Sequence, residues 1–560
     1  KNDTVTKTLI TGNTISETRT ENNVTSTVIV GREYSLKISN FATDVNQIKV
    51  KFPQGAATDK SGNTNKETEL MVYNVLKNVA EESDETTESE DNSIFFGNSN
   101  VKRRQINNIT FVSSTSGKNS TAWDVSAQQD NSILAWYTTS NGSYNVYIGS
   151  EYEMFGNIIS ARLFQYVGED SVCTATQTIT NLNLLNVSSV QSMNAMFRHT
   201  GYNAMTELNL GDNFDTSNVT EMGFMFGETG YNAMKTLNLG NKFNTSNVTN
   251  MSWMFANTGF SAMTKLDLGT NFDTINVTYM YQMFRRTGYT AMTSLNLGNK
   301  FNTSKVTVMA NMFNECGYNA MTFLNLGSNF DTSKVTNMSD MFNNCGHIAL
   351  KSLNLGSKFN TNNVTDMGRM FSHCGFEAMT SLNLGDNFDT SNVINMEDMF
   401  CATGFRAMTN LDFGNKFNTI KVTNMRQMFC ATGRFALKNL NLGENFDTSN
   451  VTNMNSMFYA CGADSLTSLD LGDKFYTKNV KDMYRLFTNL RQMTSLDLGP
   501  AFTVIPNNYV TDEWTDVDGE KVTAHYAYEK MFENNGTQNN LTIHAPESIF
   551  QDKNNFKLNT

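Results

Sequence analysis

Apolar side chains recur along this chain with a 29-residue period. Each period contains the dipeptide Met-Phe, and a degenerate copy, Leu486-Phe487, follows the last of them. The copies begin at Met196, Met225, Met254, Met283, Met312, Met341, Met370, Met399, Met428 and Met457. A fixed period of this length is typical of stacked repeats, because one unit cannot bury its apolar face alone.

The first part of each unit predicts a short strand. Met205, Leu208 and Leu210 follow the spacing L-x-x-L-x-L of a leucine-rich repeat. Alternation along a strand sends both leucines to one face and Asn209 to the other. We therefore expect one inward-facing strand per unit, with parallel strands from successive units side by side.

The second part of each unit predicts a short helix. Val219, Met222, Met225 and Phe226 lie at i, i+3, i+6 and i+7, which is the spacing of one buried helical stripe. Thr216 and Ser217 precede the stripe as candidate caps, and Gly230 follows it as a turn residue. The predicted fold class is thus an α/β solenoid of the leucine-rich-repeat type, built from parallel strands and short helices. Its methionines are expected to fill the core.

The regions outside the regular period divide the chain further. Residues 1–79 alternate like short strands and predict a β-sandwich-like domain, and residues 80–92 are an acidic linker with seven carboxylates. A β-rich N-terminal cap is expected at 93–181, the solenoid at 182–499 and a C-terminal cap at 500–560. Within the last region, residues 541–543 predict a final strand.

The repeated string from Phe446 to Met454, FDTSNVTNM, followed by Met-Phe and a Thr/Cys-Gly turn, resembles the BspA-like leucine-rich-repeat family of bacterial surface proteins. Residues 55–63 similarly resemble a loop of bacterial immunoglobulin-like surface modules. The resemblance implies extracellular display at the cell surface and adhesion to host proteins or other cells, and it carries over no catalytic residue. Many relatives have shorter units, so curvature and ligand are open.

Charge and composition narrow the function classes. The formal net charge is −12 at pH 7, which disfavours a nucleic-acid partner. No run of about 20 apolar residues predicts a membrane span. No HExxH, G-x-S-x-G or P-loop pattern is present, so we expect neither an enzyme nor a cofactor.

Three segments could hold a disulfide or a metal ion, and each also has a simpler interpretation. Seven cysteines, several of them separated by exact multiples of the period, favour a ladder of free thiols over bridges between neighbouring units. Cys345, His347, His373 and Cys374 could satisfy zinc, but adjacent residues point differently, and we expect no metal. Residues 59–65 place oxygen ligands at alternate positions like a calcium loop, although a plain hairpin turn is favoured.

Two surfaces are candidate binding sites. On the strand face, the residue between the two leucines is Asn or Asp in every unit, beginning with Asn209, Asn238, Asp267 and Asn296. These side chains either hydrogen-bond along the ladder or meet a polar ligand. The second surface carries aromatic residues off the buried stripe, with two adjoining arginines: Phe224, Trp253, Tyr279, Tyr281, Arg285 and Arg286.

A further row of aromatic residues, each next to a glycine, is expected to stack along one edge of the solenoid: Tyr202, Tyr231, Phe260, Tyr289, Tyr318, Phe376 and Phe405. The pattern as a whole favours a bacterial cell-surface adhesin or protein-interaction module. Its ligand would be a protein or glycan on a host or neighbouring cell. The alternative is a structural subunit that self-associates into a surface layer or fibre.

Overall fold

The computed structural model describes the backbone of residues 6–21, 24–39, 47–52 and 68–73 in one compact unit, 1–76. In a second unit, 77–560, it describes residues 77–80, 94–173, 175–503 and 542–544. The two units are described separately below. Among these residues, the only helical segments are two 3-10 turns, Arg103–Gln105 and Leu182–Leu184.

The first unit contains two antiparallel strand pairs. Strand β1 (Thr6–Glu21) pairs with β2 (Val24–Ser39), and β3 (Gln47–Phe52) pairs with β4 (Thr68–Tyr73). The described backbone forms these as two separate two-stranded sheets. The strands predicted for this region are therefore present among the described residues, as two antiparallel pairs. The proposed calcium loop at 59–65 lies outside the described residues.

The second unit begins with a β-rich region that precedes the repeats. Its five-stranded sheet has the order β13-β8-β11-β10-β9, and a three-stranded sheet has the order β14-β12-β5. The bounds are β5 (Lys77–Asn78), β6 (Ile94–Phe95), β7 (Asn98–Lys102), β8 (Ile106–Val112), β9 (Trp123–Asp124), β10 (Leu134–Ser140), β11 (Ser143–Gly149), β12 (Met154–Phe155), β13 (Thr178–Thr180) and β14 (Leu185–Asn186).

The first domain boundary differs from the sequence-based one. Strand β5 pairs in parallel with β12, and the Val79 and Ala80 amides donate to the Phe155 and Val125 carbonyls. Residues 77–80 thus belong to the second unit, and the division follows Leu76. The acidic stretch that follows, 81–92, lies outside the described residues.

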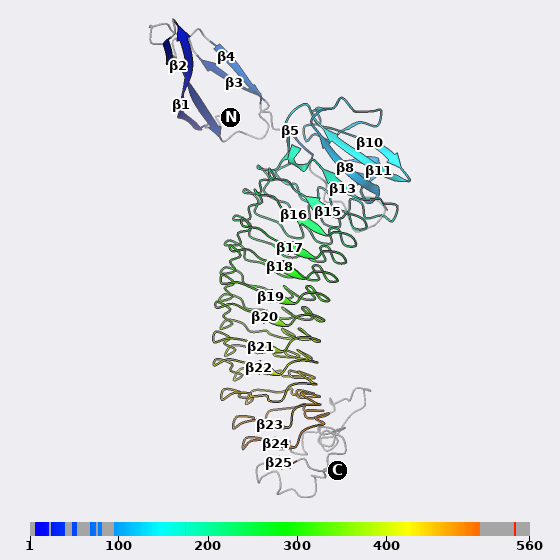
Figure 1. Cartoon of the computed structure of the whole chain (residues 1–560), viewed down its shortest axis with the longest axis vertical. Helices are drawn as coiled ribbons and strands as arrows, with labels where there is room; N and C mark the ends of the chain where they lie inside the picture. The colour runs from blue at the N-terminus through cyan, green and yellow to red at the C-terminus, as the bar shows by residue number, and fades with distance from the viewer. Residues whose placement is uncertain are drawn as a thin grey trace. The chain divides into compact units, whose positions relative to one another are not determined.

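Successive repeats stack into a coil along which the short strands follow one another (Figure 1). The central leucine of each strand is buried, as Leu208, Leu237 and Leu266 show. The strands are β15 (Glu207–Asn209), β16 (Thr236–Asn238), β17 (Lys265–Asp267), β18 (Ser294–Asn296), β19 (Phe323–Asn325), β20 (Ser352–Asn354), β21 (Ser381–Asn383), β22 (Asn410–Asp412), β23 (Ser468–Asp470), β24 (Ser495–Asp497) and β25 (Thr542–His544). They pair in parallel, and β25 confirms the predicted final strand.

Within the described repeats, the predicted helices are absent, and consecutive reverse turns occupy their place. Within one unit, the amides of Met225 and Thr229 donate to the carbonyls of Met222 and Phe226, three residues back. The intervening Phe224 and Glu228 have positive φ values of 57° and 60°. Four alternate amides, from Met222 to Glu228, instead donate to carbonyls of the next unit. A helix would keep its N–H groups within its own segment, whereas this arrangement uses half of them to join neighbouring units.

The core is continuous and rich in phenylalanine and methionine, as the sequence predicts. One row, from Phe197 to Phe487, stacks one ring per unit with centroids 5.4–5.8 Å apart. The repeat methionines, such as Met222, Met225 and Met234, are fully buried. Phe164 stacks on Phe197 at 5.2 Å, so the β-rich region extends the same row.

The strands pair two by two, which reveals a period of two repeats. Strands β15–β16, β17–β18, β19–β20 and β21–β22 form separate sheets. The loop after each strand alternates in step between Asn-Phe-Asp and Lys-Phe-Asn, beginning with residues 213–215 and 242–244. At the boundaries between pairs, the amides of Asn271, Asn329 and Asn387 donate to carbonyls of the preceding unit at 2.6–2.9 Å. The asparagine side chain thus bridges boundaries where the strands themselves are unpaired.

Candidate binding surface

Cysteine and histidine side chains separate into different layers of the stack. All seven cysteines are free, and Cys345 and Cys374 are fully buried in the core. His347 instead lies in the outer aromatic row, 4.5 Å from the rings of both Tyr318 and Phe376. Burial, together with His373, lowers the pKa of His347 to about 4. The described residues contain no group of three or more His, Cys, Asp or Glu side chains placed to hold a metal ion.

The thiols form a ladder of neutral groups. Burial raises the pKa of Cys345 to about 12 and places those of Cys316 and Cys374 well above the usual range. Cys401 and Cys430, in adjacent units, are half-buried, and a hydrogen bond between them is the main cause that raises the pKa of Cys401.

The glycine-linked aromatic row stacks along one edge with unusual regularity. Neighbouring rings from Tyr202 to Phe405 are 4.4–4.7 Å apart, with interplanar angles of at most 11°. His347 fills the position between Tyr318 and Phe376, which the sequence alone did not assign to the row. These rings cover one another, so the row stabilises the stack rather than presenting open faces.

Four aromatic residues from three successive units form a surface that we call the aromatic patch: Phe224, Trp253, Tyr279 and Tyr281. The rings of Phe224 and Trp253 are stacked at 5.4 Å with an interplanar angle of 10°. Tyr281 meets Trp253 edge-on at 5.8 Å. Tyr279 is 53% exposed and Tyr281 is 36% exposed, whereas Phe224 and Trp253 are half-buried. The structure therefore brings Phe224, Trp253 and Tyr281 together, with Tyr279 two residues before Tyr281 on the same unit.

Two arginines complete this surface, and one of them was missed from the sequence. The Arg285 guanidinium lies 5.8 Å from the Trp253 ring centroid, and the Arg198 guanidinium lies 5.2 Å from that of Phe224. Arg198 precedes Arg285 by three whole periods, so it occupies the same position in its unit, and this was the signal available. Arg286 behaves differently, because its Nε and Nη2 both donate to Glu315 at 3.0 Å. Arg286 is therefore neutralised within the stack.

The patch residues occupy conformations that bulky side chains disfavour. Phe224 and Trp253 have φ values of 57° and 61°, and the equivalent positions elsewhere hold smaller or flexible polar residues such as Asn311 and Ser456. A left-handed conformation costs a residue with a Cβ about 1–2 kcal/mol. Such local cost is typical of functional positions.

Tyr279 lacks a hydrogen bond that the equivalent residue makes in most units. At its position most units carry a side chain whose oxygen accepts from the amide two residues on, as Asn250 does from Ser252 at 2.9 Å. The others are Glu221, Asn337, Asp366, Asn395, Asn424, Asn453 and Asp482. A tyrosine cannot make this bond, so the unit gives up a hydrogen bond to hold an exposed ring.

On the strand face, the Asn or Asp between the two leucines of each strand forms local hydrogen bonds. Asn209, Asn238, Asp267 and Asn296 each accept a hydrogen bond from the glycine amide two residues on, at 3.0–3.1 Å. The expected bond along the ladder occurs among these four only from Asn296 to Asp267, at 3.1 Å. The row therefore mainly fixes the turn after each strand.

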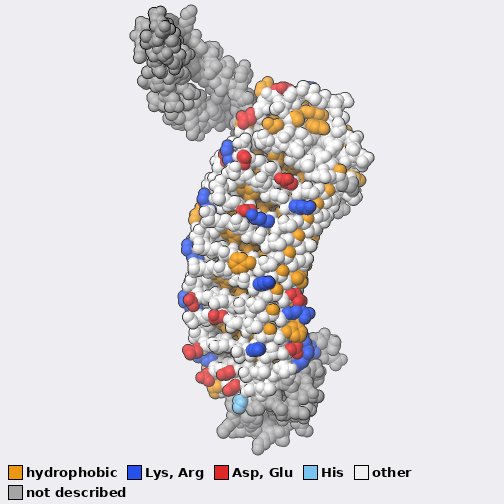
Figure 2. Space-filling model, in the orientation of Figure 1, with side chains coloured by type: hydrophobic (Ala, Val, Ile, Leu, Met, Phe, Trp, Pro, Cys, Tyr) orange, Lys and Arg blue, Asp and Glu red, His pale blue; other side chains and the backbone are white. Residues whose placement is uncertain are grey.

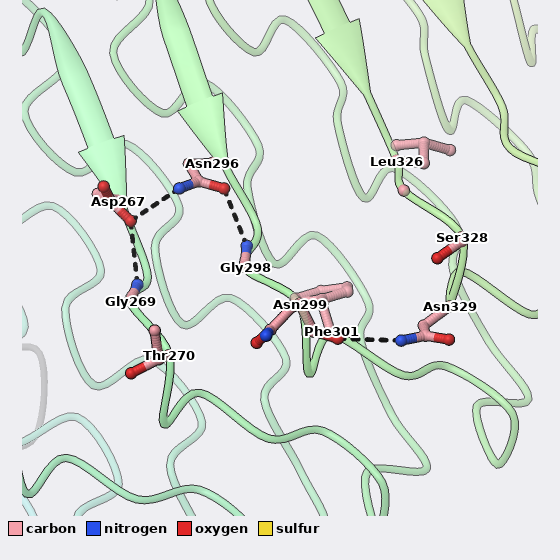
Figure 3. A pocket seen from close by; sticks show the side chains of 11 residues that line it. Asp267, Gly269, Thr270, Asn296, Gly298, Asn299, Phe301, Leu326, Ser328 and Asn329 are labelled. Atoms are coloured by element: carbon pink, nitrogen blue, oxygen red, sulfur yellow. Dashed lines mark hydrogen bonds between the residues drawn. The ribbon is translucent and has the colours of Figure 1, made fainter.

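A groove of about 630 Å³ opens beside two of these residues, Asp267 and Asn296, at the boundary between β18 and β19 (Figure 3). The side chains of Thr270, Asn299 and Ser328 also line it. Phe323, at the start of β19, is 49% exposed. The face seen in Figure 2 is otherwise mostly uncharged and polar, with scattered single charges and apolar side chains.

His199 links the β-rich region to the first repeats. Its Nδ1 lies 3.1 Å from Glu169 and its Nε2 lies 3.1 Å from Glu228. Burial works against the imidazolium, but the two carboxylates outweigh it and raise the pKa of His199. Burial also works against the charged form of Glu228, and its bond to His199 outweighs it and lowers the pKa of Glu228.

We expect His199→Gln to destabilise the protein in a pH-dependent way. The pKa of His199 is raised, so its contribution is complete below the ordinary histidine value of about 6.5 and is lost as pH rises through the folded value. The loss should be about 1.5–3 kcal/mol at about pH 5.5 and clearly smaller at about pH 9. Denaturant unfolding at both pH values measures it, and an equal loss at both would refute the ion-pair role.

Comparison with known proteins identifies the repeat region. Among the described residues, no helix has the length and apolar character needed to cross a bilayer. No curated protein and no solved structure matches the chain. The family model described as "Mycoplasma protein of unknown function, DUF285" matches repeatedly, at residues 169–291, 201–317, 232–348, 258–374, 287–410 and 401–499. These matches together span more than half of the chain, which therefore belongs to the DUF285 family.

Proposed function

We propose that this protein is a binding module displayed on a bacterial cell surface, and that it contacts a partner through the aromatic patch. The observation that carries the proposal is that the patch lowers the stability of the fold that holds it. Phe224 and Trp253 hold left-handed backbone conformations, and Tyr279 replaces a hydrogen-bonding side chain. Aromatic residues of this kind, clustered and partly exposed, are the usual energetic centre of a protein interface.

Sequence resemblance supports display outside the cell. The FDTSNVTNM strings resemble the BspA-like family of bacterial surface proteins, and residues 55–63, in the first unit, resemble a loop of immunoglobulin-like surface modules. We propose that this first unit acts as a spacer for the repeat stack. Binding is proposed rather than catalysis because the patch has aromatic rings and arginines but no acid–base pair or nucleophile.

The test compares cell binding by variants of the full chain. Fluorescently labelled protein is incubated with cultured epithelial cells, and the bound fraction is measured as a function of concentration. We expect Trp253→Ala with Tyr281→Ala to weaken binding at least about tenfold, the loss of about 1.4 kcal/mol or more that a hot spot represents. The matched control is Tyr152→Ala with Tyr476→Ala, which removes two exposed aromatic rings elsewhere.

Three outcomes would contradict the proposal. The first is unchanged binding by the Trp253 and Tyr281 variant, with unfolding temperatures equal to those of the parent protein. The second is loss of binding by Phe323→Ala alone, which would assign the contact to the strand face. The third is concentration-dependent polymers in light scattering without cell binding, which would favour the structural-subunit alternative.

A further inference from the structure

Two of the four rings of the aromatic patch, Phe224 and Trp253, already have occupied faces. Phe224 and Trp253 cover one face of each other, and Arg198 lies over the Phe224 ring. Trp253 is met by Tyr281 and Arg285. What these two rings leave to a partner is therefore their edges, which carry the positive part of the aromatic charge distribution. The exposed Tyr279 and Tyr281 lie beside them.

In the described repeats, the two arginines are not held in direct ion pairs at this surface. Within the described part of the chain, neither Arg198 nor Arg285 has a carboxylate within ion-pair distance, in contrast to Arg286, Arg369 and Arg426. Both nevertheless contribute to lowering the pKa of Glu228, after its contacts with His199. Both guanidiniums therefore act on the same small area.

Small residues occupy the repeat position between these arginines. Gly227 and Ala256 occupy the arginine position in the two intervening units, and both are buried. The stem of Arg198 lies over Gly227, 3.7 Å from where a Cβ would stand. Three successive contacts join the two guanidiniums through the rings of Phe224 and Trp253, at 5.2 Å, 5.4 Å and 5.8 Å. The arginines are therefore the two ends of one short row.

We propose that Arg198, Arg285 and the aromatic patch together bind an acidic polypeptide, an extended segment rich in Asp and Glu. This ligand class rests on the proposed function and deepens it. The surface offers two guanidiniums, two partly exposed phenol hydroxyls and positive ring edges, and the guanidiniums are its strongest hydrogen-bond donors. Carboxylates are the acceptors that suit such a surface, and Arg pairs with them in the strongest hydrogen bonds.

Geometry favours a peptide over a sugar polymer. A sugar ring packs on an open aromatic face, and here the faces of Phe224 and Trp253 are covered. An extended peptide advances about 3.3 Å per residue, so carboxylates two or four residues apart fall on one side and within the span of the two arginines. The net charge of −12 over the whole chain makes this positive surface a local exception.

The experiment is a calorimetric titration of the full chain with a synthetic peptide that alternates Glu and Ser over ten residues. The control peptide alternates Gln and Ser. We expect binding of the acidic peptide only, weakened at least about tenfold by Arg198→Gln with Arg285→Gln. The matched control, Lys242→Gln with Lys300→Gln, removes the same charge from exposed positions elsewhere in the repeat stack and should change the affinity less than about twofold.

A second pair of substitutions distinguishes loss of charge from loss of folding. Arg198→Lys with Arg285→Lys keeps both charges but loses the planar guanidinium, so it should bind more tightly than the glutamine variant and more weakly than the parent protein. Equal binding by the glutamine variants, or equal binding of the two peptides, would overturn the proposal. So would arginine-dependent binding of polygalacturonate in the absence of peptide binding. If the Trp253 and Tyr281 variant loses cell binding while no acidic peptide binds, the proposed function stands and the acidic ligand is refuted.

Discussion

Replacing Phe313 by alanine should lower the free energy of unfolding of the repeat stack by about 3–5 kcal/mol. The ring is fully buried and stacks at 5.4 Å on Phe284 and at 5.5 Å on Phe342. Its removal would leave a cavity in the middle of the row and break the contact between three units. Because each repeat is stabilised mainly by its neighbours, we expect the loss to divide the stack into two less cooperative halves.

Denaturant unfolding monitored by circular dichroism measures this loss, and the matched control lies in the same region. Phe323, ten residues later, is 49% exposed on the strand face, so Phe323→Ala should cost less than about 1 kcal/mol. Equal losses for the two variants would show that the phenylalanine row is not the interior of the stack.

The second large effect is expected at Gly240. Its φ is +75°, and a Cβ there would overlap the carbonyl oxygen of Gly211 in the paired unit. Gly269 has the same φ of +75°, but nothing lies within 4 Å of its Cβ position. Gly269→Ala should therefore cost only about 1 kcal/mol of backbone strain, whereas Gly240→Ala should cost about 1–3 kcal/mol more because the two strands must separate.

This comparison also tests the pairing of repeats, because the two glycines differ mainly in their place within a pair. We would measure the free energy of unfolding of both variants under the same conditions. The difference between the two values gives the steric contribution to the destabilisation by Gly240→Ala. If Gly269→Ala is as destabilising as Gly240→Ala, the strands do not associate two by two.

Much of the fold could be predicted from local pattern. The regular period, the inward leucines and the buried methionines follow from spacing that any single unit displays, as at Leu208 and Met222. The prediction of one helix per unit was wrong because apolar spacing at i, i+3 and i+7 also suits consecutive turns. The two differ in where the amides of residues such as Phe224 and Phe226 find their acceptors, and those acceptors lie one unit away. Phe224 and Arg369 also occupy left-handed positions where Gly or Asn would have indicated a turn.

The candidate site was predictable in its aromatic part but not in its charge. Phe224 and Trp253 occupy the same position in adjacent units, so their stacking follows from the period. Glu315 likewise follows Arg286 by one whole period, and their ion pair could have been read from the same rule. Arg198 shares its repeat position with Arg285, but its contact with Phe224 in the adjacent unit could not be predicted from that position alone. The alternation of Asn-Phe-Asp with Lys-Phe-Asn was visible in the sequence, but its link to strand pairing required the structure.

Far-ultraviolet circular dichroism of the full chain distinguishes the two ways of closing each repeat. Turns that donate alternate amides to the next unit give a spectrum of strands and turns, without the paired minima of an α-helix. We predict that spectrum, and we predict that it is lost cooperatively in the Phe313→Ala variant at lower denaturant concentration. A spectrum with a strong helical component would contradict the arrangement on which the aromatic patch and its left-handed residues depend.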